Sequence, residues 1–233
     1  MTYRAAIGAY VRDRLTRTPG VMKLPAKGLD IFLAKSFMTP DECAAMMREI
    51  DTGLRPSELL ADVGDPEFRT SRSCDVDHTK PFVGGINARI NQLLGIQPEH
   101  GEAMQGQRYD VGQQFKPHHD YFYIGQPYWE AMDRVGGQRT WTAMIFLNEP
   151  KAGGQTFFEH AGVRVTPRAG NLLTWNNLND EGEPNTYSLH QGMPVIEGAK
   201  YVITKWYRER PWGIVIDGAE EAREPLAPSG EPS

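Results

Sequence analysis

Two histidines and one aspartate have the side chains and the spacing to bind a metal ion. His118 and Asp120 stand two residues apart in a segment that we predict to be a β-strand, so both point to one face and His119 points to the other. His190, seventy residues beyond Asp120, lies in another predicted strand and can supply a third ligand if the sheet folds back. The alternative for an isolated His-x-Asp pair is a hydrogen-bonded pair on the surface, without a metal.

Two imidazoles and one carboxylate on one side of a metal ion leave its remaining positions open. This donor set is typical of non-haem Fe(II) oxygenases, in which the open positions accept substrate and dioxygen. Zinc is bound by the same donors. The donor set therefore predicts a reactive metal centre, with iron and zinc as alternatives.

A buried cation is expected ten residues after His190. Lys200 opens a predicted strand, and it shares one face of that strand with three uncharged residues, Val202, Thr204 and Trp206. An unpaired buried ammonium costs several kcal/mol, so this wall needs an anion. A small diacid that binds the metal with one end and Lys200 with the other meets that need. In the alternative, Lys200 extends to solvent and needs no partner.

The chain that positions these residues has 233 amino acids, which predicts one sizeable domain. Hydrophobic residues make up 39% of it and charged residues 24%, as in ordinary globular proteins, so collagen-like, mucin-like and wholly disordered classes are excluded. No apolar run is long enough to cross a bilayer, and the N-terminus lacks the apolar stretch of a secretory signal. We therefore expect no membrane partner and no export by the Sec route.

Charge and cysteine content narrow the setting further. The net charge is −5, and the segment 217–233, with five acids and one base, supplies four of these negative charges. The rest of the chain is nearly neutral, which argues against nucleic-acid binding through a broad basic face. The two cysteines, Cys43 and Cys74, favour the reducing cytoplasm and leave one disulfide as the alternative.

Helices are predicted in the first hundred residues. Residues 2–17 space apolar side chains helically among four arginines and one acid, which predicts an amphipathic helix packed on the domain, with a transit peptide as the alternative. Thr39 and Glu42 form a capping-box pattern that opens a helix to about Asp51. A further helical pattern covers 81–94 and ends at a glycine suited to the left-handed C-terminal position.

Strands are predicted from Gln105 onward, where short apolar or aromatic segments are separated by Gly, Pro and Asn. About eight short strands of this spacing indicate an antiparallel sandwich, jelly roll or barrel with the helices packed outside. The fold class is therefore mainly β with N-terminal helices. The predicted strands are 105–111, 118–122, 140–148, 155–158, 163–166, 171–175, 187–190 and 200–208.

Three blocks of the sequence occur in a known order. Residues 108–120 read RYDVGQQFKPHHD, residues 142–158 contain TAMIFLN followed by GGQTFF, and residues 190–206 read HQGMPVIEGAKYVITKW. They resemble the RYxxGQxYxxHxD, YLN…GGxTxF and HxGxPVxxGxKxxxxKW patterns of the prolyl 4-hydroxylase branch of the 2-oxoglutarate/Fe(II) dioxygenases. The resemblance extends over about residues 30 to 212.

The resemblance implies a double-stranded β-helix, or jelly-roll, core with N-terminal helices. It divides the chain into an N-terminal helix and lead-in over 1–29, a dioxygenase domain over 30–212 and a flexible acidic tail over 213–233. Within the domain, 30–100 forms the helical support and 101–212 the jelly-roll core.

The same resemblance assigns the cofactors. It implies that Fe(II) is bound by His118, Asp120 and His190. It also implies that 2-oxoglutarate binds the iron through its keto acid, while its far carboxylate meets Lys200 and Tyr109 in a pocket that Thr156 helps to line. Dioxygen is the other co-substrate, and ascorbate is a candidate reductant.

Two departures from the family pattern concern the substrate. Phe115 stands where these hydroxylases commonly have tyrosine, and Arg208 stands where they commonly have histidine. Losing a hydroxyl and gaining a cation change the polar groups that a target must satisfy, with tolerated variation as the alternative. The candidate substrate contacts are Phe115, Arg208, Trp206, Arg139 and Arg69, and core packing is the alternative for Trp206.

Three functions are compatible with these patterns. The first is hydroxylation of a prolyl residue in a peptide or protein, with release of succinate and CO2. The second is the same chemistry on a free amino acid or another small molecule, and the third is a non-catalytic jelly-roll binding module. Residues 60–72 are predicted to form a lid over the site, with an ordinary solvated connector as the alternative. The sequence predicts no oligomeric state.

Overall fold

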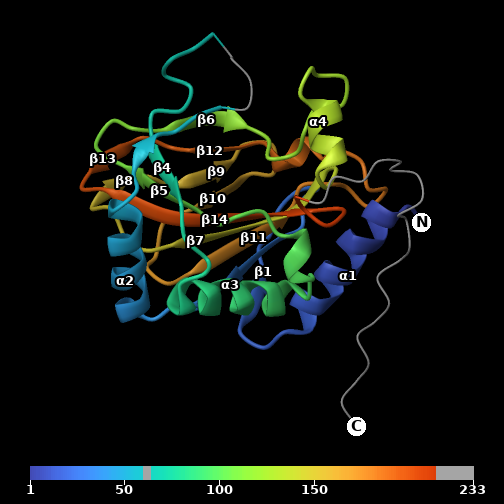
Figure 1. The fold of residues 1–233 in the computed structure, drawn as a ribbon, viewed down its shortest axis with the longest axis horizontal. Helices are drawn as coiled ribbons and strands as arrows, with labels where there is room; N and C mark the ends of the chain where they lie inside the picture. The colour runs from blue at the N-terminus through green and yellow to red at the C-terminus, as the bar shows by residue number, and fades with distance from the viewer. Residues whose placement is uncertain (60–63, 214–233) are drawn as a thin grey trace.

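The computed structural model describes residues 1–59 and 64–213 (Figure 1). The predicted tail lies outside the described residues except for Gly213, and four residues of the predicted lid, 60–63, lie outside them too. None of the helices in the described part combines the length and the apolar character that crossing a bilayer requires.

The three predicted helices are confirmed. α1 (Tyr3–Arg17) packs one face against the domain, and its buried side chains recur at helical spacing. α2 (Pro40–Asp51) begins with the predicted capping box, in which Thr39 and Glu42 each accept a hydrogen bond from the other's backbone N–H. Such a cap contributes about 1 kcal/mol. α3 (Pro81–Leu94) ends at a left-handed glycine with a φ of 70°.

Six predicted strands are confirmed with small differences at their ends. They are β5 (Gln105–Tyr109), β7 (Arg139–Phe146), β9 (Thr156–Phe158), β10 (Val163–Val165), β11 (Leu172–Asn176) and β14 (Lys200–Arg208). The other two predictions were displaced. The strand predicted over 118–122 is β6 (Phe115–His118), and the one predicted over 187–190 is a 3-10 turn (Thr186–Ser188) followed by β12 (His190–Gly192).

The displacement of β6 has a physical reason. Pro117 lies within this strand, and a proline normally argues against a strand because it lacks an N–H donor. The N–H of the preceding residue, Lys116, donates to Phe68 O on the outer side of β6, so the nitrogen of Pro117 faces β12. The register between β6 and β12 shifts at this point, and such a bulge tolerates a proline because one ladder hydrogen bond is already absent.

Several short elements carried no signal in the sequence, because two to six residues are too few to show a period. The missed helical elements are α4 (Trp129–Arg134) and the 3-10 turn Pro98–His100. The missed strands are β1 (Val21–Lys23), β2 (Ile31–Ala34), β3 (Arg55–Pro56), β4 (Arg72–Asp75), β8 (Ala152–Gly153) and β13 (Val195–Glu197).

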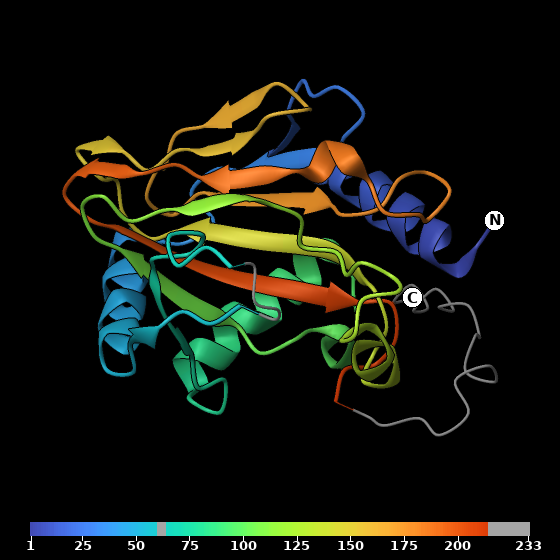
Figure 2. The same cartoon turned by 90° about the horizontal axis from the view of Figure 1, so that it is seen from above.

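Two antiparallel sheets form the jelly-roll core. The large sheet has eight strands in the order β1-β2-β11-β7-β14-β5-β4-β3, and the small sheet has four in the order β10-β9-β12-β6. β8 and β13 pair separately. Figure 1 shows α1, α2 and α3 on the side of the large sheet away from the small one, and Figure 2 shows α1 and α2 at opposite ends of this layer. The predicted fold class is confirmed.

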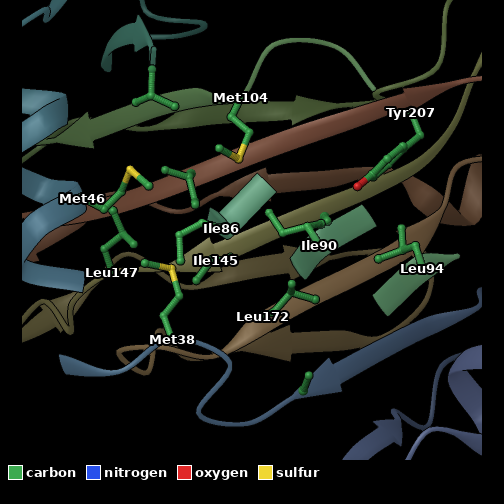
Figure 3. Packing of buried hydrophobic residues seen from close by; sticks show 14 of the residues in the cluster. Met38, Met46, Ile86, Ile90, Leu94, Met104, Ile145, Leu147, Leu172 and Tyr207 are labelled. Carbon is green, nitrogen blue, oxygen red and sulfur yellow. The ribbon is translucent and has the colours of Figure 1, made fainter. Parts of the chain in front are cut away.

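Each face of the large sheet has its own core. One cluster of buried side chains fills the space between the sheet and the helices, and Figure 3 shows Met46 of α2, with Ile86 and Ile90 of α3, facing Ile145 of β7. The second cluster lies between the two sheets and contains Phe146, Phe158, Leu173 and Trp175, among others. The candidate site opens within the second cluster.

Both cysteines belong to the supporting side of the fold. Cys43 and Cys74 are buried free thiols in the cluster next to the helices. The alternative of a disulfide between them is therefore wrong for this structure.

Candidate metal centre

The pairing of two strands of the small sheet brings the two predicted histidine ligands together. His118 is the last residue of β6, His190 is the first residue of β12, and the two are direct partners in the antiparallel register. Asp120 lies two residues past the end of β6, in a bend rather than in the strand that we predicted. One donor atom from each of the three residues lies within 4.8 Å of the others, so a single ion can be bound by all three.

Both imidazoles are oriented by backbone carbonyls. His118 Nδ1 lies 2.8 Å from the carbonyl oxygen of Lys116, and His190 Nδ1 lies 2.9 Å from that of Ser188. A carbonyl only accepts, so Nδ1 carries the proton in each ring and Nε2 keeps its lone pair. The two Nε2 atoms lie 3.8 Å and 3.9 Å from the Asp120 carboxylate. The three lone-pair donors therefore point to one place.

Burial sets the charge states that a metal requires. Burial, together with the neighbouring His190, lowers the pKa of His118 to about 3, so this imidazole is neutral at physiological pH. Burial by itself would raise the pKa of Asp120, but His190, His118 and Arg139 outweigh it and lower that pKa below its usual value. A neutral imidazole and an ionised carboxylate are the forms that bind a metal ion. Neither His118 nor Asp120 therefore has to lose a proton before it binds a metal.

A pocket of about 410 Å³, partly open to solvent, extends from these three residues to Lys200. The predicted face of β14 is confirmed, since Lys200, Val202, Thr204 and Trp206 all line this pocket. Tyr109, Phe115 and Thr156 line it as well. The structure thus brings together, in one pocket, all three predicted metal ligands and all three predicted co-substrate contacts.

Lys200 is a buried cation without an anionic partner among the described residues. It is 2% exposed, and burial lowers its pKa to about 7. Its Nζ donates to Thr156 Oγ1 at 3.4 Å, and the rings of Tyr109 and Phe146 lie 5.4 Å and 5.7 Å away. The alternative in which Lys200 extends to solvent is therefore wrong, and the pocket favours an anionic ligand at this end.

Tyr109 stands beside Lys200 because their strands pair. The two residues are direct partners in the register between β5 and β14. The Tyr109 hydroxyl donates to Gln107 Oε1 at 2.8 Å, and burial raises its pKa. Tyr109 is therefore a neutral phenol with an oxygen that can accept, and its proton can be redirected to a carboxylate that enters the pocket.

Two of the candidate substrate contacts meet a residue that sequence reasoning missed. Glu102, which is 9% exposed, forms ion pairs with Arg139 and with Arg208, each at 2.6 Å. Arg139 also packs on the ring of Trp206 at 4.2 Å and reaches the backbone oxygen of Asp120 at 3.4 Å. This cluster links the pocket wall to the metal centre. The sequence around Glu102 contains no local pattern that would have predicted it.

Two further candidate contacts, Phe115 and Arg69, form a stack over a metal ligand. The ring of Phe115 lies on the ring of His118, with centroids 3.5 Å apart, and the Arg69 guanidinium lies 4.8 Å above Phe115. Backbone bonds hold the segment before β4 along β6, since Thr70 N donates to Gln114 O and Lys116 N donates to Phe68 O. The described part of the predicted lid thus packs against the strand that ends at the metal centre.

Three more residues of the site had no sequence signal that we recognised. Thr142 Oγ1 donates to Asp120 Oδ2 at 2.8 Å, and Asn177 Nδ2 donates to Thr142 Oγ1 at 2.9 Å. Trp175 lines the pocket, and its buried Nε1 has no hydrogen-bond partner among the described residues. The alternation of side chains on β7 and β11 could have placed Thr142 and Trp175 on the faces toward the small sheet, but it could not have identified their partners.

Sequence comparison relates the chain to known oxygenases. Residues 104–208 match the family model described as the 2OG-Fe(II) oxygenase superfamily. The chain is 31% identical to a probable prolyl 4-hydroxylase 6 of Arabidopsis thaliana, over 86% of this chain and 77% of that protein. It is 34% identical to the prolyl 4-hydroxylase subunit alpha-1 of Gallus gallus, over 67% of this chain but only 32% of that longer protein.

Solved structures share the fold. A viral collagen prolyl hydroxylase from Paramecium Bursaria Chlorella virus-1, in its 2OG complex, superposes with a TM-score of 0.60 at 21% identity, covering 78% of this chain and 96% of that one. A prolyl hydroxylase from Trichoplax adhaerens, in complex with a hypoxia inducible factor peptide fragment, gives a TM-score of 0.59 at 15% identity, covering 88% and 90%.

Proposed function

This chain belongs to the prolyl 4-hydroxylase-like branch of the 2-oxoglutarate/Fe(II) oxygenase superfamily, and from that premise we propose that it hydroxylates a prolyl residue of a peptide or protein. The observation that carries the proposal is one pocket with a three-donor metal site at one end and, at the other, a buried lysine that has no anionic partner within residues 1–59 and 64–213. A keto diacid matches both ends.

His118, Asp120 and His190 are the proposed iron ligands. The fit rests on the donor set, since two Nε2 lone pairs and one ionised carboxylate converge while both Nδ1 protons are held by carbonyls. Two imidazoles and a carboxylate on one side of Fe(II) leave positions open for other molecules. When bound, Fe(II) and 2-oxoglutarate supply the oxidising chemistry, in which 2-oxoglutarate and dioxygen yield succinate and CO2 as a C–H bond of the target becomes C–OH.

Lys200, Tyr109 and Thr156 are the proposed contacts of the far carboxylate of 2-oxoglutarate. An ammonium, a phenol and a threonine hydroxyl can together satisfy a carboxylate that has lost its water. The carboxylate in turn stabilises the charged form of Lys200, which the empty pocket disfavours. The protein thus selects a diacid by leaving one buried cation unsatisfied until the diacid binds.

Phe115, Trp206, Arg139, Arg208 and Arg69 are the proposed substrate contacts, and they differ in how they can act. Phe115 and Trp206 line the pocket with aromatic rings. Arg139 and Arg208 are engaged by Glu102, so they hold the wall in place before any target arrives. Because Phe115 has no hydroxyl, recognition of the target relies on packing at this position rather than on a hydrogen bond.

The setting of the reaction is part of the proposal. A free-thiol state of Cys43 and Cys74 supports the reducing cytoplasm as the location. Ascorbate is the proposed reductant that keeps the iron ferrous, and the proposed partner is a peptide or protein segment that contains proline.

The test is anaerobic reconstitution with Fe(II), followed by addition of 2-oxoglutarate, oxygen and a panel of proline-containing peptides and free amino acids. Mass spectrometry should find one added oxygen atom on a peptide, at proline, with one succinate formed for each product. Matched peptides with alanine at that proline should remain unmodified. Product among the free amino acids alone would move the target to a small molecule, and metal binding with no succinate from any target would favour a binding module.

A further inference from the structure

Asp120 lies outside the strand whose hydrogen bonds hold His118, so its side chain needs an anchor of its own. β6 ends at His118, and Asp120 is in the bend that follows. Among the described residues its carboxylate accepts one hydrogen bond, which Thr142 Oγ1 donates to Oδ2 at 2.8 Å. The other oxygen, Oδ1, accepts none there. Oδ1 lies 3.8 Å from His118 Nε2, and Oδ2 lies 3.9 Å from His190 Nε2. Both oxygens therefore face an imidazole, but only Oδ2 is tethered.

Asn177 fixes the direction of this tether. A threonine hydroxyl has one proton, and an ionised carboxylate can only accept, so the proton of Thr142 must point to Asp120. Thr142 Oγ1 must then accept from its other neighbour, and Asn177 Nδ2 lies 2.9 Å away to donate. The opposite placement of the amide atoms would set two acceptors against a single proton. The network therefore has one consistent orientation.

The tether lies in a fully buried, hydrogen-bonded part of the large sheet. Thr142 lies on β7 and Asn177 directly follows β11, and both are 0% exposed. Thr174 Oγ1 donates to the carbonyl of Thr142 at 2.7 Å, and the backbone N–H of Asn177 donates to Thr140 O at 2.7 Å. Because solvent does not reach these groups, water cannot replace a lost hydroxyl, and Asp120 would keep a buried oxygen without a donor.

We propose that Thr142 is a positioning residue for Asp120 and that Asn177 orients its hydroxyl. The proposal rests on the proposed function, because it takes Asp120 as a metal ligand. Thr142 holds Oδ2 and so fixes the plane of the carboxylate, which leaves Oδ1 without a protein donor and able to bind the metal. Side chains that orient metal ligands commonly contribute about 10- to 100-fold to metal affinity. Thr142 does so without touching the metal.

The experiment measures Co(II) binding to the protein without oxygen or 2-oxoglutarate, by calorimetry and by the visible absorption of the bound ion. Thr142→Val keeps the side-chain volume but removes the proton, and we expect about 10- to 100-fold weaker Co(II) binding with a changed spectrum. Thr142→Ser restores the proton and should return the affinity to within about threefold of wild type. Asn177→Ala leaves the hydroxyl but frees its rotation, so its loss should be smaller, at about three- to tenfold.

Thr140→Val is the matched control. Thr140 is 1% exposed and lies on the same strand as Thr142, but its hydroxyl donates to the backbone carbonyl of Tyr207 and contacts neither Thr142 nor Asp120. This variant should unfold at a lower temperature than wild type and bind Co(II) with unchanged affinity and spectrum.

The outcomes separate the two claims. Wild-type Co(II) affinity and spectrum in Thr142→Val would overturn the positioning role while leaving the metal site intact. Equal loss of Co(II) affinity in Thr142→Val and Thr140→Val would also overturn it, since the effect would then be general destabilisation. Failure of wild type and Thr140→Val to bind Co(II) at all would instead overturn the proposed function. If Thr142→Val does not fold, unchanged Co(II) binding by Asn177→Ala would overturn the claim that Asn177 orients the Thr142 hydroxyl.

Discussion

The two faces of strand β14 each bury a lysine, and the lysines differ in what surrounds them. Lys200 is 2% exposed and lines the pocket between the sheets, whereas Lys205 is 3% exposed and lies on the opposite face. Lys205 Nζ donates to the carbonyl of Glu102 at 3.1 Å. Burial lowers the pKa of Lys200 to about 7, while Glu102 offsets part of the burial of Lys205 and leaves its pKa at about 8.

The difference shows how one strand serves both stability and function. On the face toward the helices, Tyr201, Ile203 and Tyr207 belong to a packed apolar core, and the lysine there has its acceptor supplied by the fold. On the face toward the pocket, Lys200 has only a neutral acceptor, the hydroxyl of Thr156. The indole N–H groups of Trp175 and Trp206, which also line the pocket, have no acceptor among the described residues. Of the two lysines of β14, the satisfied one supports the structure, and the unsatisfied one is placed to select the ligand.

The largest effects should come from replacing one residue at the pocket and one in the core between the large sheet and the helices. Asp120→Ala removes one of three proposed metal ligands, so Fe(II) affinity should fall by more than about 100-fold with little loss of stability. Ile203→Ala leaves a cavity in the core and should cost about 2–5 kcal/mol of unfolding free energy, while the folded fraction binds metal normally. Metal content and urea unfolding measure the two. Equal losses of metal affinity in both variants would break the comparison.

The two lysines provide the next test. Lys200→Met should weaken binding of 2-oxoglutarate to the metal-loaded, oxygen-free protein by about 10- to 100-fold, because a charged hydrogen bond is lost. Metal affinity should change little. Lys205→Met should leave 2-oxoglutarate affinity within about twofold of wild type and alter the unfolding temperature, because its partner is a structural carbonyl. Calorimetry of both variants decides, and a comparable loss of 2-oxoglutarate affinity in Lys205→Met would contradict the division between the faces.

The low pKa of Lys200 predicts a pH dependence with a definite sign. Near pH 7 the free pocket begins to lose the ammonium proton, and a bound dianion restores it, so binding above about pH 7 takes up a proton. Affinity for 2-oxoglutarate should fall as pH rises from about 7, by at most about tenfold per pH unit. Tyr109, which faces Lys200, has a raised pKa and stays neutral in this range.

Calorimetry in two buffers of different ionisation heat measures this proton uptake. Lys200→Arg is the control, since a guanidinium stays charged and should bind without it. A wild-type affinity that does not change between about pH 6.5 and about pH 9 would show that Lys200 is not the group that titrates.

Two tryptophans provide the smallest and most specific contrast. Trp141 and Trp175 are both buried, and each has an Nε1 without a partner among the described residues, but Trp141 packs in the core near the helices and Trp175 lines the pocket. Trp175→Phe should weaken 2-oxoglutarate or substrate binding by about three- to tenfold, because an N–H donor facing the ligand is lost. Trp141→Phe should lower stability alone. If both variants bound 2-oxoglutarate and substrate as wild type does, the indole N–H of Trp175 would have no role in recognising either molecule.

Much of the site could be predicted because its residues occur at spacings that can be recognised in the sequence. His118 and Asp120 are two positions apart, Lys200 stands on a strand whose alternation is visible, and the spacing to His190 follows a family pattern. The strand boundary at His118 was wrong by three residues at its start, because a proline inside an edge strand looks like a strand end. The error did not affect the predicted ligands, since His118 at the end of the strand and Asp120 just beyond it still point to the same place.

Sequence alone determined the chemistry of this protein: which donors are present, which face of β14 carries a lysine and where the helices begin. Tertiary structure alone decided that Glu102 joins Arg139 and Arg208, that Thr142 tethers Asp120, and that one buried lysine is satisfied while the other is not. The physical reason is range. Local spacing fixes which way a side chain points, but a hydrogen bond or ion pair is fixed by its partner, and these partners lie 22 to 106 residues apart along the chain.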